Sequence, residues 1–260
     1  MPIRLLDCLR QRREQRVLQR RAIPAVLWRL TLARLPFLAR LTPADQDELR
    51  RLSSLFLDRK EFSGAHGLTV TDDMAVAIAA QACLPVLRLG LRAYDGFVGI
   101  VVQPDEVLVR REVTDDDGIV HEYDDVLSGE AMDGGPVMLS WHDVGQAGES
   151  SAWGYNVVIH EFAHVLDMGD GVADGVPPLA DAAARRHWRA TLAREYAAFC
   201  ALVDAGADTL LDPYAAEAPE EYFAVASEAF FVAPLDLRAE RPASYALLAG
   251  YYRQDPAARA

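Results

Sequence analysis

Residues 157–167 read Val157-Val158-Ile159-His160-Glu161-Phe162-Ala163-His164-Val165-Leu166-Asp167. His160 and His164 are four residues apart, so on an α-helix both imidazoles leave the same face, one turn apart, and can reach one ion. The order H-E-x-x-H is typical of zinc hydrolases, in which two histidines hold the metal and the glutamate activates a water molecule. The stretch therefore predicts a metal-binding helix with Glu161 as the general base.

The residues around the motif predict that it forms a buried helix. Its valines and larger apolar residues give it an apolar face, although β-branched residues are weak helix formers, so packing must stabilise it. Asn156 is a suitable N-cap, and Gly169 and Gly171 stand where the helix should end. The alternative is a buried helix whose histidines bond to neighbouring carbonyl groups. Two histidines at this spacing beside a glutamate favour the metal.

The composition predicts a globular protein with a sizeable core. Of the 260 residues, 51% are hydrophobic, which is too many for general disorder. No run of about eighteen uncharged apolar residues exists, and arginines interrupt the start of the chain where a secretion signal would be apolar. We therefore expect a cytoplasmic protein without a transmembrane segment. Cys8, Cys83 and Cys200 form no C-x-x-C pair, which argues against disulfides and a cysteine-ligated zinc.

Charge is distributed unevenly along the chain. Residues 1–60 hold 14 of the 26 basic and 6 of the 39 acidic residues, so they carry +8, and the rest carries −21 of the total −13. We expect a basic arm at 1–22 and a single domain at 23–260. The arm could contact a membrane surface, nucleic acid or the acidic body of the chain, and we favour the last. The acidic body is a poor match for phosphates, so no direct nucleic-acid partner is expected.

Hydrophobic periodicity and capping residues predict an α+β fold, with a small mixed sheet packed on helices. Glycines, prolines and caps bound the elements. An acidic turn at 115–118 is read as a solvated hairpin rather than a calcium loop. The predicted helices cover 24–35, 42–56, 75–83, 182–203 and 219–231, and the predicted strands cover 97–102, 106–110, 120–126 and 137–141.

Two further expectations concern the surroundings of the metal helix. The strand at 137–141 is our candidate for a sheet edge that binds a peptide backbone by β-pairing. Residues 145–153 are rich in glycine and serine and predict a mobile loop at the mouth of the site. His142 could be a further metal ligand, although a surface position is favoured.

A zinc ion held by two histidines needs a third protein ligand and an open position for water. The helix predicted at 219–231 offers Glu220, Glu221 and Glu228. Glu221 and Glu228 are seven residues apart and share one face, whereas Glu220 points about 100° away from Glu221. Helix geometry alone leaves more than one candidate open.

Residues 160–167, Tyr214 and the segment 221–231 resemble the Mlc titration factor A (MtfA) family of zinc peptidases. The similarity extends to residues 78–85 and 139–141, so it spans most of the chain. The ligand arrangement also resembles the catalytic domain of anthrax lethal factor, in which a tyrosine precedes the ligand glutamate by seven residues. Tyr214 precedes Glu221 by the same spacing, and this selects Glu221.

The resemblance implies a zincin-like fold with a gluzincin-like site. In it, His160, His164 and Glu221 hold Zn²⁺, Glu161 is the general base, and Tyr214 donates a hydrogen bond to the oxyanion. Asp167 and Glu228 are candidates for orienting the histidines through their other ring nitrogens, with capping or helix-surface roles as the alternative.

The family likeness also implies an activity and a partner. The expected function is a zinc-dependent peptidase, more narrowly an aminopeptidase, acting on peptide substrates. The alternative is a regulatory binding protein that sequesters a transcriptional repressor similar to Mlc, with peptidase activity secondary.

Overall fold

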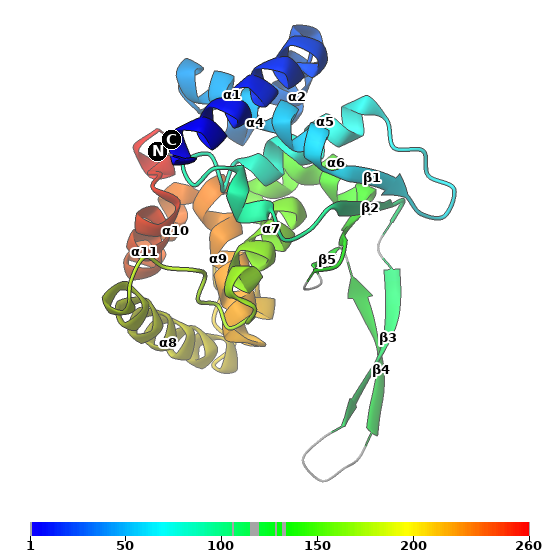
Figure 1. Ribbon diagram of the computed structural model, residues 1–260. Helices are drawn as coiled ribbons and strands as arrows, with labels where there is room; N and C mark the ends of the chain where they lie inside the picture. The colour runs from blue at the N-terminus through cyan, green and yellow to red at the C-terminus, as the bar shows by residue number, and fades with distance from the viewer. Residues whose placement is uncertain (1, 106, 115–119, 128, 132–133, 260) are drawn as a thin grey trace.

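Helices make up most of the molecule, and a small sheet lies beside them (Figure 1). The computed structural model describes residues 2–105, 107–114, 120–127, 129–131 and 134–259. The α-helices are α1 (Pro2–Arg21), α2 (Ala25–Arg34), α3 (Pro36–Ala39), α4 (Pro43–Arg59), α5 (Asp72–Cys83), α6 (Trp141–Ser150), α7 (Val157–Asp167), α8 (Ala182–Asp204), α9 (Pro219–Val232), α10 (Pro234–Glu240) and α11 (Pro242–Tyr252). Short 3-10 turns are η1 (Leu91–Tyr94), η2 (Ser151–Trp153), η3 (Met168–Asp170), η4 (Pro213–Ala216) and η5 (Pro256–Ala258).

The sheet is mixed and has the strand order β1-β2-β6-β5. Strands β1 (Glu61–Gly64), β2 (Gly99–Gln103) and β6 (Val137–Ser140) are parallel, and β5 (Gly129–Ala131) pairs antiparallel with β6. A separate antiparallel hairpin of β3 (Val107–Thr114) and β4 (Val120–Leu127) extends away from the helical body (Figure 1). The prediction of helices with a small mixed sheet is confirmed. The predicted turn at 115–118 lies outside the described residues.

Two sequence-based expectations are wrong. Strand β6 is not a sheet edge, because β2 pairs with one side of it and β5 with the other. The edges are β1 and β5, and β5 is the edge that lies against α7. Periodicity does not predict β5, because it has only three residues. Residues 145–153 are not a loop, since α6 and η2 cover them. Ser140 caps α6 by accepting a hydrogen bond from the Asp143 amide at 3.3 Å.

Three helices form the buried centre on which the site is built. Helix α7 packs against α9 and α5, and β5 also lies against it. Helix α5 is almost entirely buried, and Thr71 caps it as the sequence predicts, by accepting from the Met74 amide at 3.3 Å. Phe162 of α7 is fully buried, and its ring lies 5.0 to 5.7 Å from those of Phe56, Tyr94 and Phe97. These contacts fix α7 in the core.

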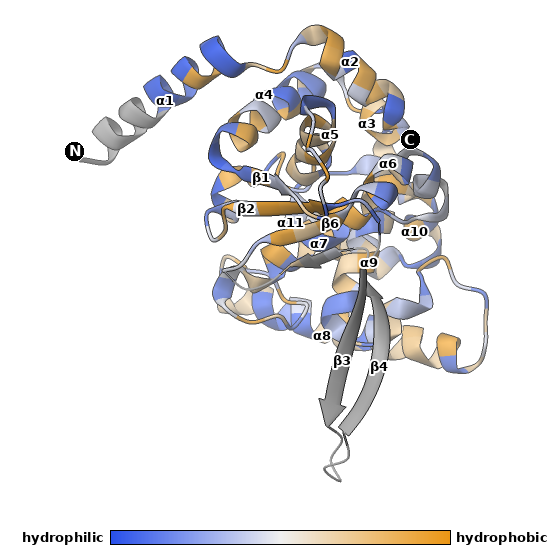
Figure 2. Ribbon diagram, turned by 90° about the vertical axis from the view of Figure 1, so that its right-hand side faces the viewer, coloured by the Kyte–Doolittle hydropathy of each residue, from blue (hydrophilic) through white to orange (hydrophobic). Residues whose placement is uncertain are grey.

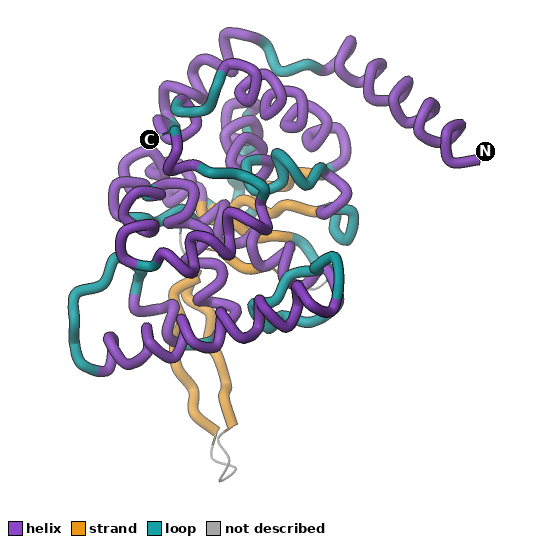
Figure 3. Tube along the Cα trace, turned by 90° about the vertical axis from the view of Figure 1, so that its left-hand side faces the viewer, coloured by secondary structure: helices purple, strands orange, loops and turns teal. Residues whose placement is uncertain are grey.

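Helix α1 contacts α4 and then extends outward (Figures 2 and 3). Glu14 lies 3.4 Å from Arg51 and 3.3 Å from Arg59, and Arg21 lies 3.4 Å from Asp58. These ion pairs are therefore with α4 of the same basic segment. Exposed ion pairs of this kind contribute about 0–1 kcal/mol each. Among the described helices, none combines the length and the apolar character needed to cross a bilayer.

Candidate metal centre

The motif helix α7 begins and ends where its capping residues predict. The Asn156 side chain accepts a hydrogen bond from the Ile159 amide at 2.9 Å, which satisfies one of the free amides at the helix start. After α7, η3 ends at Gly171, which has φ +91°, a conformation that glycine adopts at low cost. His160 and His164 therefore leave neighbouring turns of a fixed helix.

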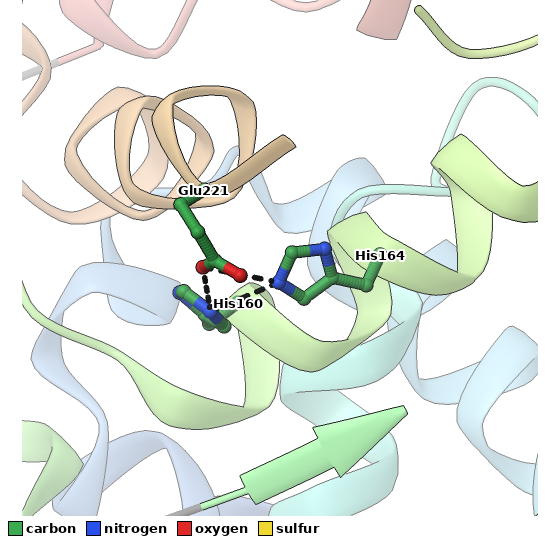
Figure 4. Close-up of side chains that lie close together, drawn as sticks. All are labelled: His160, His164 and Glu221. Carbon is green, nitrogen blue, oxygen red and sulfur yellow. Dashed lines mark hydrogen bonds and ion pairs between the residues drawn. The ribbon is translucent and has the colours of Figure 1, made fainter. Parts of the chain in front are cut away.

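Two histidines of α7 and one glutamate of α9 point their donor atoms at one place (Figure 4). His160 Nε2 lies 3.1 Å from His164 Nε2 and 3.2 Å from Glu221 Oε2, and His164 Nε2 lies 3.4 Å from the same oxygen. Ligand atoms about 2 Å from a tetrahedral zinc are about 3.3 Å apart, so the three observed separations fit such an ion. Glu221 Oε2 is buried and makes no hydrogen bond, which also suits a metal ligand.

The charges around these atoms favour a cation. Burial by itself raises the pKa of Glu221, but the two nearby imidazoles outweigh it and lower that pKa to about 2. Burial disfavours the charged form of His160, yet Glu221 and Glu228 raise its pKa well above the ordinary value. His160 therefore holds an extra proton in the place where a metal ion would bind. Since Glu161 is also buried here, three carboxylates surround two imidazoles, and a divalent ion would offset much of their charge.

Glu228 contacts the ring nitrogen of His160 that faces away from Glu221. One of its oxygens lies 2.8 Å from His160 Nδ1, and the other accepts a hydrogen bond from the Asn156 amide. The Asn156 side chain donates in turn to Gln81 Oε1 of α5 at 2.7 Å. This buried chain of polar groups leaves Nε2 of His160 facing Glu221, so the geometry favours the orienting role for Glu228 over a capping or helix-surface role.

Asp167, the other candidate for orienting a histidine, has a different contact. Its Oδ2 accepts a hydrogen bond from the Gly175 amide at 2.7 Å, and its buried Oδ1 has no hydrogen-bond partner. Burial raises the pKa of Asp167 to about 7, although the Gly175 amide opposes that shift. Its described hydrogen bond therefore ties the end of α7 to the loop before α8, and it is neither a contact with a histidine nor a helix cap.

The carboxylate of Glu161 lies against the edge strand β5. It is 4% exposed, and a Cβ atom placed on Gly129 would lie only 2.4 Å from its Oε1. Burial raises the pKa of Glu161 to about 7. The histidines oppose the shift, and the carboxylates of Glu221 and Glu228 add to it. A carboxylate with a pKa near neutrality is well suited to accept and return a proton.

The remaining predicted residues divide between the site and the surface. The ring of Tyr214, in η4 ahead of α9, has its centroid 6.2 Å from that of His160, and the residue is 39% exposed. His142 is exposed on α6, where its Nε2 lies 2.8 Å from Gln146, as the surface alternative predicts. Glu220 does not belong to the group of three donors.

Sequence reasoning did not identify two residues that shape the site. Gly129 could have been suspected because a glycine in a strand often marks a close approach of another group, but the strand itself was not predicted. Gln81 is fully buried in a helix that is otherwise apolar after its first turn, and a lone polar residue there signals a buried hydrogen bond. Its partner, Asn156, lies too far along the chain to be inferred.

Comparisons with known proteins find relatives over most of the chain. The model of the family described as glucose-regulated metallo-peptidase M90 matches residues 9–253. An uncharacterized protein of Synechocystis sp. is 37% identical over 94% of this chain and 89% of its own length. The Mlc titration factor A of Pectobacterium atrosepticum is 40% identical, and that of Klebsiella pneumoniae 38%. Each match covers 89% of this chain and 87% of the relative.

Proposed function

This chain belongs to the glucose-regulated metallopeptidase M90 family, and on that premise we propose that it is a zinc-dependent peptidase of the zincin-like, gluzincin type. The observation that carries the proposal is the convergence of His160, His164 and Glu221, with the carboxylate of Glu161 beside them. The donor set is two imidazole nitrogens and one carboxylate oxygen, as in catalytic zinc sites.

The protein groups of the site would have separate tasks in peptide hydrolysis. A zinc ion held by the three ligands would supply Lewis acidity and lower the pKa of a coordinated water to near 7. Glu161 accepts a proton from the attacking water and passes it to the leaving amine. Tyr214 donates its phenolic proton in a hydrogen bond to the oxygen on which negative charge develops. Glu228 holds the ring of His160 throughout.

The peptide substrate pairs with the edge strand β5. Strand β5 pairs with β6 on one side and is the last strand of the sheet, and Gly129 brings its backbone against Glu161. An extended peptide added beside β5 would carry its scissile bond past the general base. We assign this role to β5 in place of β6. Cleavage at the amino terminus of cytoplasmic peptides is the specificity that the family resemblance suggests.

The test separates metal binding from catalysis. Glu161→Gln should keep one zinc ion per chain and lose about 10²–10⁴-fold in the hydrolysis rate of aminoacyl and short peptide reporters, because an amide cannot accept the proton. Glu220→Gln, next to the ligand on α9, is the matched control and should retain full activity. A Glu161→Gln protein with unchanged activity, or a wild-type protein that binds no zinc, would refute the proposal.

Sequestration of a transcriptional repressor is the second candidate. It is favoured by the name of the relatives, Mlc titration factor A. Such binding needs a surface and no proton transfer, so capture of an Mlc-like repressor should survive Glu161→Gln while hydrolysis is lost. If wild type and Glu161→Gln both capture the repressor and neither hydrolyses peptides, repressor binding is the sole function.

A further inference from the structure

A cavity of about 590 Å³ lies between α8 and α11 and contains none of the proposed metal ligands. Its volume is within the range of small-molecule sites. Apolar side chains such as Leu89, Leu179 and Leu247 form much of its wall. The indole N–H of Trp188, also in the wall, already donates a hydrogen bond to the Gly175 carbonyl oxygen at 2.8 Å. Most of the cavity is thus suited to a hydrocarbon group.

The rim of the cavity is cationic although the chain as a whole is acidic. His187 and Arg194 of α8 and Arg253 after α11 line it. Residues 182–194 contain four arginines, of which Arg189 pairs with Asp174 at 2.8 Å and Arg194 pairs with Glu195 at 3.2 Å. The Arg194 side chain is still 61% exposed. Cations near a helix N-terminus are disfavoured by the helix dipole, so the dipole does not explain the arginines in the first half of α8. The rim complements an anionic group.

Two residues beside the cavity depart from the usual way of ending a helix. Gly250 lies inside the last turns of α11, where alanine would be more stable, and a Cβ atom added there meets nothing within 4 Å. Arg253 occupies the left-handed position with φ +53°, where glycine is preferred. Both departures cost stability, and both residues line the cavity, where the glycine adds no side chain and the arginine places a charge at the rim.

A second cavity adjoins this one on the side of the metal helix. It has a volume of about 480 Å³, shares Leu89, Pro178 and Tyr251 with the first and is also lined by Val165 and Leu166 of α7. The neighbouring space suits a long unbranched chain. A peptide fits less well, because its amide groups would lose water without finding enough hydrogen-bond partners in these walls.

We propose that the cavity between α8 and α11 binds the anion of a long-chain fatty acid. Its carboxylate lies at Arg194 and Arg253, and its acyl chain lies along Leu247 and Gly250. The site is separate from the metal centre, so it stands whether or not the chain is a peptidase.

The test is displacement of a fluorescent fatty acid from the full-length protein by dodecanoate below its micellar concentration. Dodecanoate should displace the probe, whereas dodecanol and hexanoate should do so about ten-fold less well, because one lacks the charge and the other most of the apolar surface. Failure of dodecanoate, or equal displacement by dodecanol, would overturn the proposal. If the protein binds phosphatidylglycerol vesicles but dodecanoate does not displace the fluorescent fatty acid, the surface binds a membrane, and the fatty-acid proposal is overturned.

Variants locate the site. Gly250→Leu fills the cavity and should weaken binding about ten-fold or more, while Gly250→Ala should stay within about two-fold. Arg253→Gly removes the charge and relieves the backbone, so it should weaken binding about five-fold without loss of thermal stability. Arg186→Ala, on α8 but outside the cavity lining, is the charge control. Unchanged affinity in Gly250→Leu or Arg253→Gly, with both proteins folded by circular dichroism, would refute the assignment.

Discussion

Glu228 has two oxygens in two different positions, and each has its own partner. One faces His160 Nδ1 at 2.8 Å, and the other accepts from the amide of Asn156 at the start of the same helix. The residue is 1% exposed, so water cannot replace either contact. A single buried carboxylate therefore fixes the orientation of a proposed ligand and the start of the helix that carries it.

The first prediction follows from that dual contact. Glu228→Gln keeps an oxygen that can accept from one partner but removes the charge that favours proton donation by His160 Nδ1. Zinc affinity should fall about 10–100-fold, while the protein remains folded. Competition with a chromophoric chelator measures it, with Glu220→Gln as the matched control on the same helix. An unchanged affinity would mean that Glu228 serves only to cap α7.

The second prediction concerns the close approach of β5 to the general base. In Gly129→Ala, the new methyl group would lie where the Glu161 carboxylate is, so that carboxylate must move. A displacement of about 1 Å at a reacting group can cost about 10²-fold in rate. We expect that loss in peptide hydrolysis at unchanged zinc content. Gly145→Ala on α6, where an added Cβ meets nothing within 4 Å, should be neutral. Equal rates for both variants would contradict this reading.

Sequence spacing could predict part of this site. His160, Glu161 and His164 lie within one helical turn and a half, so their relation is local and readable from the sequence. Glu221 and Glu228 share a helix face, and spacing alone could not decide which of them faces Nε2 and which faces Nδ1. That choice depends on how α9 packs on α7, which only the folded chain provides.

At the scale of elements, Asp167 and Gly175 connect the end of α7 to the loop that precedes α8. Gly175 donates its amide to Asp167 and accepts at its carbonyl oxygen from Trp188. Its φ is +74°, and a Cβ atom there would lie 2.6 Å from the Pro219 carbonyl oxygen at the start of α9. Three helices thus meet at one residue that must be glycine.

The third prediction is a pH dependence of stability. Burial raises the pKa of Asp167 from 3.8 to about 7, so the folded state holds a proton that the unfolded state releases. The stabilisation is complete below pH 3.8 and is lost as the pH rises through 7. Asn at this position does not titrate and can still accept from Gly175.

Urea unfolding of the metal-free proteins measures this effect. Between pH 5 and 8, wild type should lose about 2–3 kcal/mol of unfolding free energy relative to Asp167→Asn. Asp204→Asn, at the exposed end of α8, should follow the wild-type curve. Parallel curves for wild type and Asp167→Asn would contradict the prediction.

Helices were easier to predict than the sheet for a physical reason. Thr71, Asn156 and Pro219 mark helix starts by local hydrogen bonding or a fixed φ, so each boundary is encoded within a few residues. Strand neighbours are set by distant segments. The periodicity of β6 identified a strand, but its position inside the sheet depended on β2 and on β5, which is too short to carry a pattern of its own.

At the scale of the whole molecule, the proposed metal would join parts of the chain that are far apart in sequence. The histidines lie on α7 and Glu221 lies on α9, with the whole of α8 between them. Without a cation, the buried carboxylates of Glu161 and Glu228 and the charge of Glu221 lie close to one another at the α7–α9 contact. Their mutual repulsion opposes the packing of α7 and α9.

The fourth prediction is that chelation lowers global stability. An ion that binds only the folded chain stabilises it by about 3–4 kcal/mol when it is present at 100 to 1,000 times its dissociation constant. For a protein of this size that corresponds to about 10 °C in Tm. Removal of zinc should lower the midpoint by that amount, and added zinc should restore it. Glu221→Ala should show no response to either treatment, because its ligand set is incomplete and one repelling charge is gone. If the Tm of wild type does not change when zinc is removed or added, α7 and α9 are held together without the ion.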